Sequence, residues 1–498
     1  MRHSTIAARW AAGILVGTAA SLAVAGSDYT LSLLLYETQA APDGSLITDI
    51  STVAVNDAGD WFVTVTTDNA DPDLRFVMIR NGTQFAREND ALAAPVGSNI
   101  SSFDSQRINA NGDAGWNLFL RNTGGTTNDS GIFFNTTLLI QESAVSNATD
   151  FSPGTPYIGF FEVRMNDANQ LASVLSVDDP AITTSVDRAL MRLDYDPGMG
   201  ILTEAVVYKE GDVLPGQEQA LTDFGTTHDT FGFNNAGDVL YVASLTGNTA
   251  TNGVIYRNDT LIAQKGDPSP VDARTYANIG TSTKVAINDA GDVVFKASLA
   301  GDLATDTILI RNGQKFMQEG DLAPQVGGET LTGFGTGPVW INDLGVVWYG
   351  AWTGATANNH GLFLNDQLLI RRGVTTIDGF NVTTVAGSVN GSGGISNGFE
   401  TSPNGRYIIL RAVIEDPANP GVFPTAVLLL TRAGLPGDMN CDGVVNNFDI
   451  DPFVLALTDA AAYEATFPNC DINNADASGD GLINNFDIDP FVALITGG

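Results

Sequence analysis

Basic residues and histidine are scarce in this chain of 498 residues. It has 23 Lys and Arg against 57 Asp and Glu, which gives a formal net charge of −34. A protein that binds nucleic acid by neutralising phosphates needs a basic face, so this balance excludes that class. With only 3 His, a zinc site built on His pairs is poorly supported. The chain also contains no HExxH and no Walker A pattern.

Apolar runs long enough to span a bilayer are absent after the first 25 residues. At the N-terminus, Arg2 and Arg9 precede the apolar run Trp10–Leu22, and the small residues Ala23 and Ala25 follow it. This order predicts a secretory signal peptide over residues 1–25. A membrane anchor is the alternative, for which the run is short. We therefore expect a mature chain that is secreted or displayed at the cell surface, without a transmembrane segment.

A repeated phrase fills most of the remaining chain. It consists of an apolar residue followed by Asn-Asp-Ala-Gly-Asp, and its best copy is residues 287–292. The copies are anchored, in chain order, at Asn56, Asn109, Asn166, Asn234, Asn288, Asn342 and the decayed Ser402. Their spacings are 53, 57, 68, 54, 54 and 60 residues. Periods near 50 residues are typical of propellers and solenoids rather than of separate globular domains.

Each repeat contains the pattern of four short strands. The Asn/Asp/Gly cluster supplies a tight turn, and a run rich in β-branched and aromatic residues follows, as in Val293–Leu299. A further strand such as Thr307–Arg311 ends in a second turn, Asn312-Gly313, and a fourth strand runs into a Gly-Asp-x-x-Pro loop. Four strands joined in this way predict one propeller blade.

The two ends of the repeat region complement each other. The seventh repeat stops without a fourth strand, whereas residues 31–37 form an isolated strand pattern before the first repeat. Pairing these ends would close the ring and remove exposed sheet edges. The fold class is therefore predicted as mainly β: a seven-bladed β-propeller over residues 26–433, with a β-solenoid of the same repeats as the alternative.

The propeller sequence offers no catalytic residue. A formal G-x-S-x-G match, Gly394–Gly398, lacks the strand–turn–helix context of a nucleophile. Paired carboxylates for glycoside hydrolysis cannot be selected among 57 acids. Whether the chain is an enzyme stays open, with a non-enzyme favoured. If it is an enzyme, we expect a glycoside hydrolase that acts on polysaccharide.

The C-terminal residues 438–498 follow a short linker, 434–437, and have a different pattern. Two 12-residue segments carry oxygen donors at positions 1, 3, 5, 9 and 12, Gly at position 6 and a backbone carbonyl at position 7. This is the EF-hand calcium pattern with Asp in place of the position-12 Glu. The predicted ligands of two Ca²⁺ ions are Asp438, Asn440, Asp442, Val444, Asn446 and Asp449, then Asp476, Ser478, Asp480, Leu482, Asn484 and Asp487.

Helix and cysteine patterns complete the prediction for this segment. Apolar residues at helical spacing follow each loop, with Phe453 and Phe491 at equivalent places. Phe448 and Ile450, like their counterparts in the second copy, fit either a core or a partner surface, and the core is favoured. The only two cysteines, Cys441 and Cys470, are predicted to form a disulfide in an exported module.

A C-terminal pair of calcium loops, each followed by a helix, resembles the type I dockerin module. The resemblance covers about residues 435–498 and implies a small α-helical calcium-binding domain that docks onto a cohesin-like protein or a cell-surface scaffold. It also implies partner contacts at loop positions 10 and 11, which here are Asn447, Phe448, Asn485 and Phe486. Both copies read Asn-Asn-Phe-Asp-Ile-Asp-Pro-Phe-Val, so a partner has two equivalent ways to dock. The segment departs from the family in having no Lys or Arg after Arg432.

Three functions follow from these patterns. The first is a non-enzymatic propeller that binds a glycan or protein and is tethered through the calcium module. The second is an extracellular carbohydrate-active hydrolase carried by a dockerin. The third is a structural component of the cell envelope.

Overall fold

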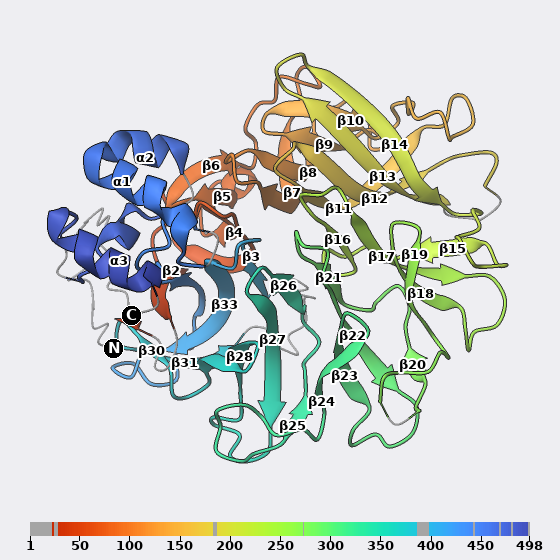
Figure 1. Ribbon diagram of the computed structural model, residues 1–498. Coiled ribbons are helices and arrows are strands. Elements are labelled where there is room, and N and C mark those ends of the chain that lie inside the picture. Colours follow the sequence, from red (N-terminus) through yellow and green to blue (C-terminus); the bar gives the residue numbers. More distant parts are fainter. Residues whose placement is uncertain are drawn as a thin grey trace, which may run out of the picture.

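The described residues form seven antiparallel sheets arranged around one axis in a computed structural model (Figure 1). The structure describes residues 22–23, 28–182, 187–271, 273–385, 398–441, 444–467, 470–479 and 482–496. The predicted cleavage site and most of residues 1–25 lie outside these ranges, as do residues 394–397 of the G-x-S-x-G match.

The sheets follow one another along the chain as blades 1 to 7. Blade 1 contains β3 (Ile47–Val55), β4 (Trp61–Thr67), β5 (Phe76–Arg80) and β6 (Thr83–Arg87), with the short helix η1 (Pro72–Leu74) between β4 and β5. Blade 2 contains β7 (Asn99–Ile108), β8 (Ala114–Arg121), β9 (Ser130–Phe134) and β10 (Thr137–Gln141). Blade 3 contains β11 (Tyr157–Met165), β12 (Gln170–Val177), β13 (Asp187–Asp196) and β14 (Ile201–Lys209).

In blades 4 to 7 the innermost strand is split into two pieces. Blade 4 contains β15 (Leu221–Phe224), β16 (Phe231–Phe233), β17 (Val239–Leu245), β18 (Gly253–Arg257) and β19 (Thr260–Gln264). Blade 5 contains β20 (Tyr276–Asn278), β21 (Val285–Ile287), β22 (Val293–Leu299), β23 (Thr307–Arg311) and β24 (Gln314–Gln318). Blade 6 contains β25 (Leu331–Gly333), β26 (Trp340–Asn342), β27 (Gly345–Trp352), β28 (His360–Leu364) and β29 (Gln367–Arg371). Blade 7 contains β30 (Thr376–Ile377), β31 (Phe380–Val385), β32 (Phe399–Thr401), β33 (Tyr407–Glu415), β34 (Thr425–Arg432), and the N-terminal β2 (Tyr29–Tyr36) and β1 (Leu22–Ala23).

The blades close into a ring. The innermost strands contact one another in the order β3, β7, β11, β16, β21, β26 and β32, and β32 contacts β3 again. Each repeat packs on two neighbours, whereas a solenoid would leave the first and last repeats apart. The prediction of a seven-bladed propeller is confirmed, and the solenoid alternative is wrong.

The N-terminal strand closes this ring. β2 pairs antiparallel with β34, from Tyr29 opposite Arg432 to Tyr36 opposite Ala426. It therefore supplies the outer strand that the seventh repeat lacks, as the sequence predicts. Tyr29 and Leu31 are buried by this pairing, and the pairing covers an edge of β34 that would otherwise be open to aggregation.

Glycine occupies the position of the repeated turn that needs a left-handed backbone. Three residues after the anchor Asn, Gly59 and Gly291 have φ of 83° and 80°. Blade 3 has Asn169 at this place, with φ of 60°. Asn adopts this region more readily than most residues, which explains why the repeat tolerates Asn-Asp-Ala-Asn there.

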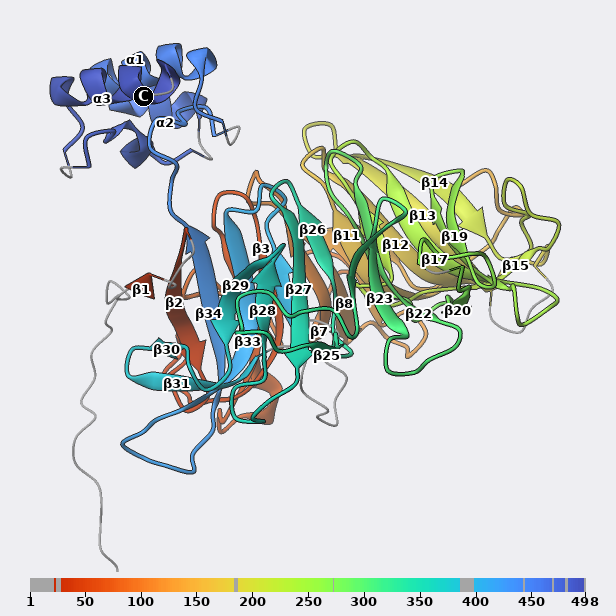
Figure 2. The same cartoon turned by 60° about the horizontal axis from the view of Figure 1, so that its bottom comes forward.

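The C-terminal residues form a separate small helical module on one face of the ring (Figure 2). Its helices are η2 (Asn447–Asp449), α1 (Ile450–Thr458), α2 (Ala460–Thr466), η3 (Ile472–Ala475), η4 (Asn485–Asp487) and α3 (Ile488–Thr496). Phe453 of α1 and Phe491 of α3 form its centre, together with Met439 and Tyr463. Cys441 and Cys470 form the predicted disulfide. The two segments predicted as calcium loops, residues 438–449 and 476–487, end directly before α1 and α3 and are called the calcium-type loops below.

None of the helices in the described ranges is both long enough and apolar enough to cross a membrane.

Candidate functional site

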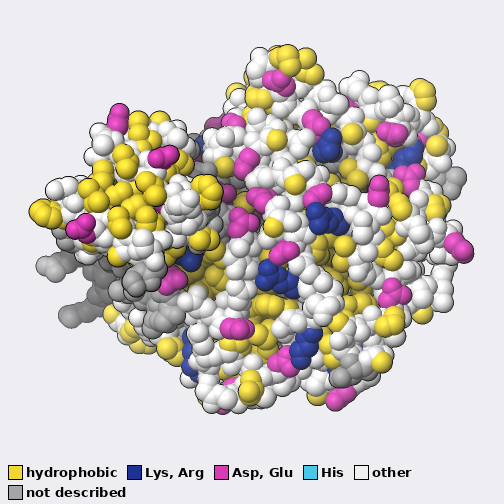
Figure 3. Space-filling model, viewed as in Figure 1, with side chains coloured by type: hydrophobic (Ala, Val, Ile, Leu, Met, Phe, Trp, Pro, Cys, Tyr) yellow, Lys and Arg dark blue, Asp and Glu magenta, His cyan; other side chains and the backbone are white. Residues whose placement is uncertain are grey.

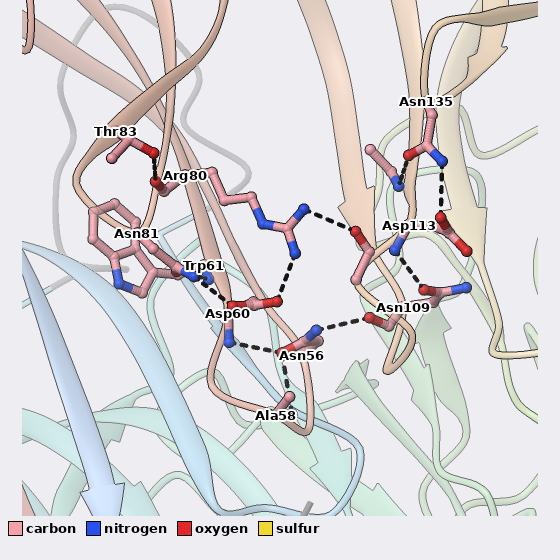
Figure 4. Close-up of polar contacts among 12 residues, drawn as sticks. Asn56, Ala58, Asp60, Trp61, Arg80, Asn81, Thr83, Asn109, Asp113 and Asn135 are labelled. Carbon is pink, nitrogen blue, oxygen red and sulfur yellow. Dashed lines mark hydrogen bonds and ion pairs between the residues drawn. The ribbon is translucent and has the colours of Figure 1, made fainter. Parts of the chain in front are cut away.

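The anchor Asn of each repeat holds its own turn together. In blade 1, Asn56 Oδ1 accepts hydrogen bonds from the backbone N–H of Ala58 (3.1 Å) and Asp60 (2.8 Å), as Figure 4 shows. The second turn of the blade is tied to the first, because Asn81 Oδ1 accepts from Trp61 N at 2.9 Å. These contacts agree with the interpretation of the repeated phrase as a capped turn.

The same Asn side chains also link neighbouring blades. The side-chain nitrogen of each anchor Asn donates to an oxygen of the next blade. These hydrogen bonds run in one direction around one end of the central channel of the propeller, which we call the channel mouth. The bonds are Asn56 to Asn109 O (2.7 Å), Asn109 to Asn166 O (3.4 Å), Asn166 to Asn234 O (3.2 Å), Asn234 to Asn288 O (2.9 Å), Asn288 to Asn342 O (3.2 Å) and Asn342 to Thr401 Oγ1 (2.7 Å). Blade 7 has Ser402 at the anchor, and Asn404 closes the circle by donating its backbone N–H to Asp57 Oδ1 at 2.9 Å. We call this circle the Asn ring.

Arginine residues at the ends of the third strands add a second link between blades. Arg80 contacts Asp60 of its own blade at 2.7 Å and donates to Gly112 O of blade 2 at 3.0 Å (Figure 4). Arg257 of blade 4 repeats both contacts, with Asp238 at 2.6 Å and Gly291 O at 2.8 Å. These arginines have structural partners, so they are not a basic surface available to a ligand.

A small hollow of about 50 Å³ lies on the axis inside the Asn ring. Asp57, Asp167 and Asp289 line it, and Asn235 donates its amide to both Asp167 and Asp289 at 2.8 Å. Burial raises the pKa of Asp57 to about 7; the nearby carboxylates of Asp167, Asp289 and Asp343 add to the rise, and the N–H of Asn404 opposes it. The channel mouth is therefore acidic and sensitive to pH near neutrality.

Below this mouth, large side chains cross the channel. Arg107 of blade 2 reaches Glu400 of blade 7 at 3.4 Å, past the intervening blade 1. Arg164 of blade 3 lies over the ring of Trp340 in blade 6, with the guanidinium carbon 4.6 Å from the ring centroid. Burial and the neighbouring Arg107 together lower the pKa of Arg164 to about 9, while the carboxylate of Glu400 opposes this shift. Because these residues meet across the axis, the interior of the ring is packed rather than an open pore.

The two calcium-type loops fold around their last carboxylate. In the first loop, Asp449 accepts backbone N–H bonds from Asn440 (3.0 Å) and Asn446 (2.8 Å). In the second loop, Asp487 accepts from the equivalent Ser478 (3.0 Å) and Asn484 (2.9 Å). Positions 3, 9 and 12 are thus brought together in both loops.

The remaining described donors lie beside these positions. Asn446 Nδ2 donates to Val444 O at 3.3 Å, and Asn484 Nδ2 donates to Leu482 O at 3.5 Å, which places position 7 next to position 9. In the second loop Asp476 Oδ1 accepts from Ser478 Oγ at 3.2 Å, which joins position 1 to position 3. The oxygen-only donor set and its convergence fit a hard cation such as Ca²⁺.

Two of the predicted ligands are not among the residues that the structure describes. Asp442 and Asp480, at position 5 of each loop, lie outside the described residues. Among the residues that are described, no group of three or more His, Cys, Asp or Glu side chains is arranged to hold a metal. Each loop contributes two described carboxylates, Asp438 with Asp449 and Asp476 with Asp487; its other described donors are amide, hydroxyl or carbonyl oxygens.

The aromatic residues at loop position 11 are on the surface. Phe448 is 71% exposed and Phe486 is 73% exposed. Ile450 and Ile488 are also exposed, so the favoured prediction that these four residues form the core is wrong. The apolar centre of the module is formed by Phe453 and Phe491 instead. The exposed Asn447 and Asn485 precede the two aromatic residues, and Figure 3 shows apolar side chains gathered over this module.

The comparisons with known proteins decide the family. The model of a family described as "Family of unknown function (DUF7453)" matches residues 11–309, more than half of the chain. The chain belongs to this family. The DUF7453 match ends in β23 of blade 5, so the helical module lies outside it. A search of curated proteins finds no match.

Solved structures that resemble this DUF7453 protein do so weakly. The WD40 domain of SCAP from fission yeast has 10% identity and a TM-score of 0.33, over 82% of this chain and 99% of that chain. Polysaccharide lyase Uly1 has 9% identity and a TM-score of 0.31, over 82% and 91%. Trypanosoma rangeli sialidase in complex with sialic acid has 11% identity and a TM-score of 0.30, over 77% and 72%. Likenesses this weak say nothing about what the DUF7453 protein binds or catalyses.

The buried charges of the channel are the feature that sequence reasoning missed. Arg107, Arg164, Trp340 and Glu400 each stand two residues before the anchor of their repeat. The same position holds the small residues Ala54, Gly232 and Ala286 in the other three blades. An alignment of the repeats on their anchors would have shown this one column, in which four repeats have a large or charged residue and three have a small one.

Proposed function

We propose that residues 438–498 are a dockerin-like calcium module, which fastens the exported propeller to a cohesin-like protein or another cell-surface scaffold. In this proposal the propeller is displayed on the scaffold and binds a glycan or protein ligand. The observation that carries the proposal is the pair of loops. The two loops match in sequence around their last carboxylate and have the same hydrogen-bond geometry around Asp449 and Asp487.

The charge of the segment supports bound cations. Residues 434–498 contain 11 acids and no Lys or Arg, and six of those acids occupy predicted ligand positions. Without a cation, these carboxylates repel one another within a small module whose core is limited. Two Ca²⁺ ions would add four positive charges where the acids are concentrated, so binding would also stabilise the folded module.

The exposed aromatic residues support a docking role. A large apolar side chain with most of its surface in water contributes little to folding, whereas it stabilises a complex when a partner covers it. Phe448 and Phe486 are such residues, and each lies at position 11 of its predicted calcium loop, within the short helix η2 or η4. Calcium would fix the loop, and the loop would fix the position of the aromatic ring.

Calorimetric titration of the mature chain with CaCl₂ tests the metal site. We expect two binding events in the wild type and one in each of Asp449→Asn and Asp487→Asn. Asp451→Asn is the matched control, because Asp451 is an exposed acid of the same module that holds no ligand position. Absence of binding heat, together with near-UV circular dichroism that does not change on chelation, would overturn the proposal.

A further inference from the structure

Among the described residues, an ion pair joins the C-terminal module to the propeller at the start of the short helix η3. Arg406, in the turn between β32 and β33 of blade 7, contacts Asp471 with 3.0 Å between Nη2 and Oδ2. Asp471 is the N-cap of η3, since its Oδ1 accepts from Asn473 N at 2.9 Å. The ion pair therefore joins the propeller to the N-cap residue of η3.

The same helix holds the linker between the two domains. Asn474 of η3 is buried, and its carbonyl accepts from Gly437 N at 2.7 Å. A Cβ atom at Gly434 would lie 1.7 Å from Asn474 Oδ1, so no other residue fits there without movement. Both ends of the linker, Gly434 and Gly437, therefore contact η3, whereas Leu435 and Pro436 between them are exposed.

η3 also touches the first ligand position of both calcium-type loops. Asn474 Nδ2 donates to Asp438 O of the first loop at 2.7 Å. The helix ends at Asp476, which is the first residue of the second loop. In addition, Cys470 is bonded to Cys441 inside the first loop and directly precedes Asp471.

We infer from these contacts that calcium binding and the docking of the module on blade 7 stabilise each other. The inference rests on the proposed function, because it needs calcium in the loops. Ordering of the first loop fixes the side of η3 that carries Asn474, and ordering of the second loop fixes its C-terminal end. When η3 is fixed, Asp471 is held in position to contact Arg406. By linkage, a contact that calcium strengthens must strengthen calcium binding by the same factor.

Charge favours this contact. The module has no Lys or Arg after Arg432, so a positive side chain of the propeller is attracted to its acids. Arg406 is held in place for this role: its guanidinium lies 5.7 Å from the centroid of the Tyr407 ring, and its backbone N–H donates to Asn404 Oδ1 at 2.8 Å. A partly exposed ion pair of this kind changes a linked affinity by about two- to fivefold.

The test compares two arginine variants of the full chain. Arg406→Gln removes the contact to η3, whereas Arg311→Gln removes a similar Arg–Asp pair, 2.8 Å long, in blade 5. CaCl₂ titration gives the dissociation constants, and hydrogen exchange of the Gly437 amide at sub-saturating calcium reports the packing of the linker. We expect Arg406→Gln to raise the calcium dissociation constant by about two- to fivefold and to speed this exchange. Arg311→Gln should match the wild type in both.

A second variant guards against an effect of Arg406 on folding. Asp471→Asn keeps the capping oxygen of η3 and removes only the charge, so it should reproduce the loss of affinity. Combined with Arg406→Gln it should add nothing further, because both variants remove the same interaction. Unchanged affinity and unchanged exchange in both variants would overturn the inference while leaving the calcium site intact. A wild type that binds no calcium would overturn the inference and the proposed function together.

Discussion

Phe453 stacks face to face on Phe491, with ring centroids 3.9 Å apart and planes 3° apart. The two residues occupy the same place after their calcium-type loops, so the contact joins equivalent positions. Contact between equivalent residues is the mark of a two-fold axis. The two loops, and the two exposed aromatic residues beside them, are therefore related by a local symmetry that passes between α1 and α3.

This stack predicts that the stability of the module depends more on Phe453 than on the adjacent Val454. Phe453→Ala removes a buried ring that packs on Phe491 and should lower the free energy of unfolding of the module by about 3–5 kcal/mol. Val454→Ala is the control, since Val454 is largely exposed. Hydrogen exchange of α1 in the full chain measures both. Equal protection in the two variants would show that the stack does not hold the module together.

The symmetry also predicts which substitutions lower the affinity for a cohesin-like partner. Phe448→Asp and Phe486→Asp each spoil one of two equivalent surfaces, so either single variant should still bind a cohesin-like partner at near wild-type affinity. The double variant should lose at least tenfold in affinity, which is the size of effect expected for a large aromatic anchor. Biolayer interferometry against a panel of purified cohesin modules, with and without calcium, measures this. Full loss in one single variant would mean that only that copy docks.

The Asn ring predicts a large effect for a single small change. Asn288→Ala removes the acceptor for Asp292 N, at 2.7 Å, and the donor to Asn342 O. Buried backbone groups would lose their partners, and we expect a loss of about 2–3 kcal/mol in urea denaturation. Asn278→Ala, an exposed position of the same blade, should change stability by less than about 0.5 kcal/mol. Similar losses in both variants would argue against the ring.

The raised pKa of Asp57 predicts a dependence of stability on pH. The folded chain holds this proton up to about pH 7, whereas the unfolded chain releases it near the ordinary carboxyl pKa of 3.8. Stability therefore falls as pH rises between these two values. Asp57→Asn keeps an oxygen for the Asn404 N–H and removes the charge, so it should stabilise the protein at pH 8 by about 1–3 kcal/mol.

Thermal unfolding at several pH values measures this effect. The gain from Asp57→Asn should shrink as pH falls, and most of it should be gone near pH 4, where the wild-type carboxyl is also neutral. Asp302→Asn is the control, because Asp302 lies on an exposed loop of blade 5. A gain that is the same at pH 4 and pH 8 would assign the effect to packing rather than to charge.

Much of this fold follows from local patterns in the sequence. Val293–Leu299 and Thr307–Arg311 are predicted as strands and form β22 and β23 with the same bounds. The turn chemistry is local: the anchor Asn caps its own turn, and the left-handed position requires Gly or Asn. The closure of the ring by β2 also follows from the sequence. An isolated strand pattern precedes the first repeat, and the seventh repeat lacks its fourth strand.

The contents of the channel could not be predicted in the same way. Arg107 finds Glu400 almost three hundred residues further along the chain, and only the closed ring brings them together. Likewise, no periodicity separates Phe448 from Phe453, since both are apolar and close to a helix start. Which of them is buried depends on the geometry of the second copy, because Phe491 takes up the space in the centre of the module.

The pairing of β2 with β34 sets the order in which this chain can mature. Tyr29 and Arg432 are opposite each other in the sheet, so β2 cannot pair with β34 until nearly all of the propeller has been synthesised. Such a distant contact forms late in folding, because the entropy of closing so long a loop is lost before the pairing stabilises anything. The last blade can therefore form only after β34 has been synthesised. A chain that is truncated or stalled before β34 leaves the edge of β2 open to aggregation.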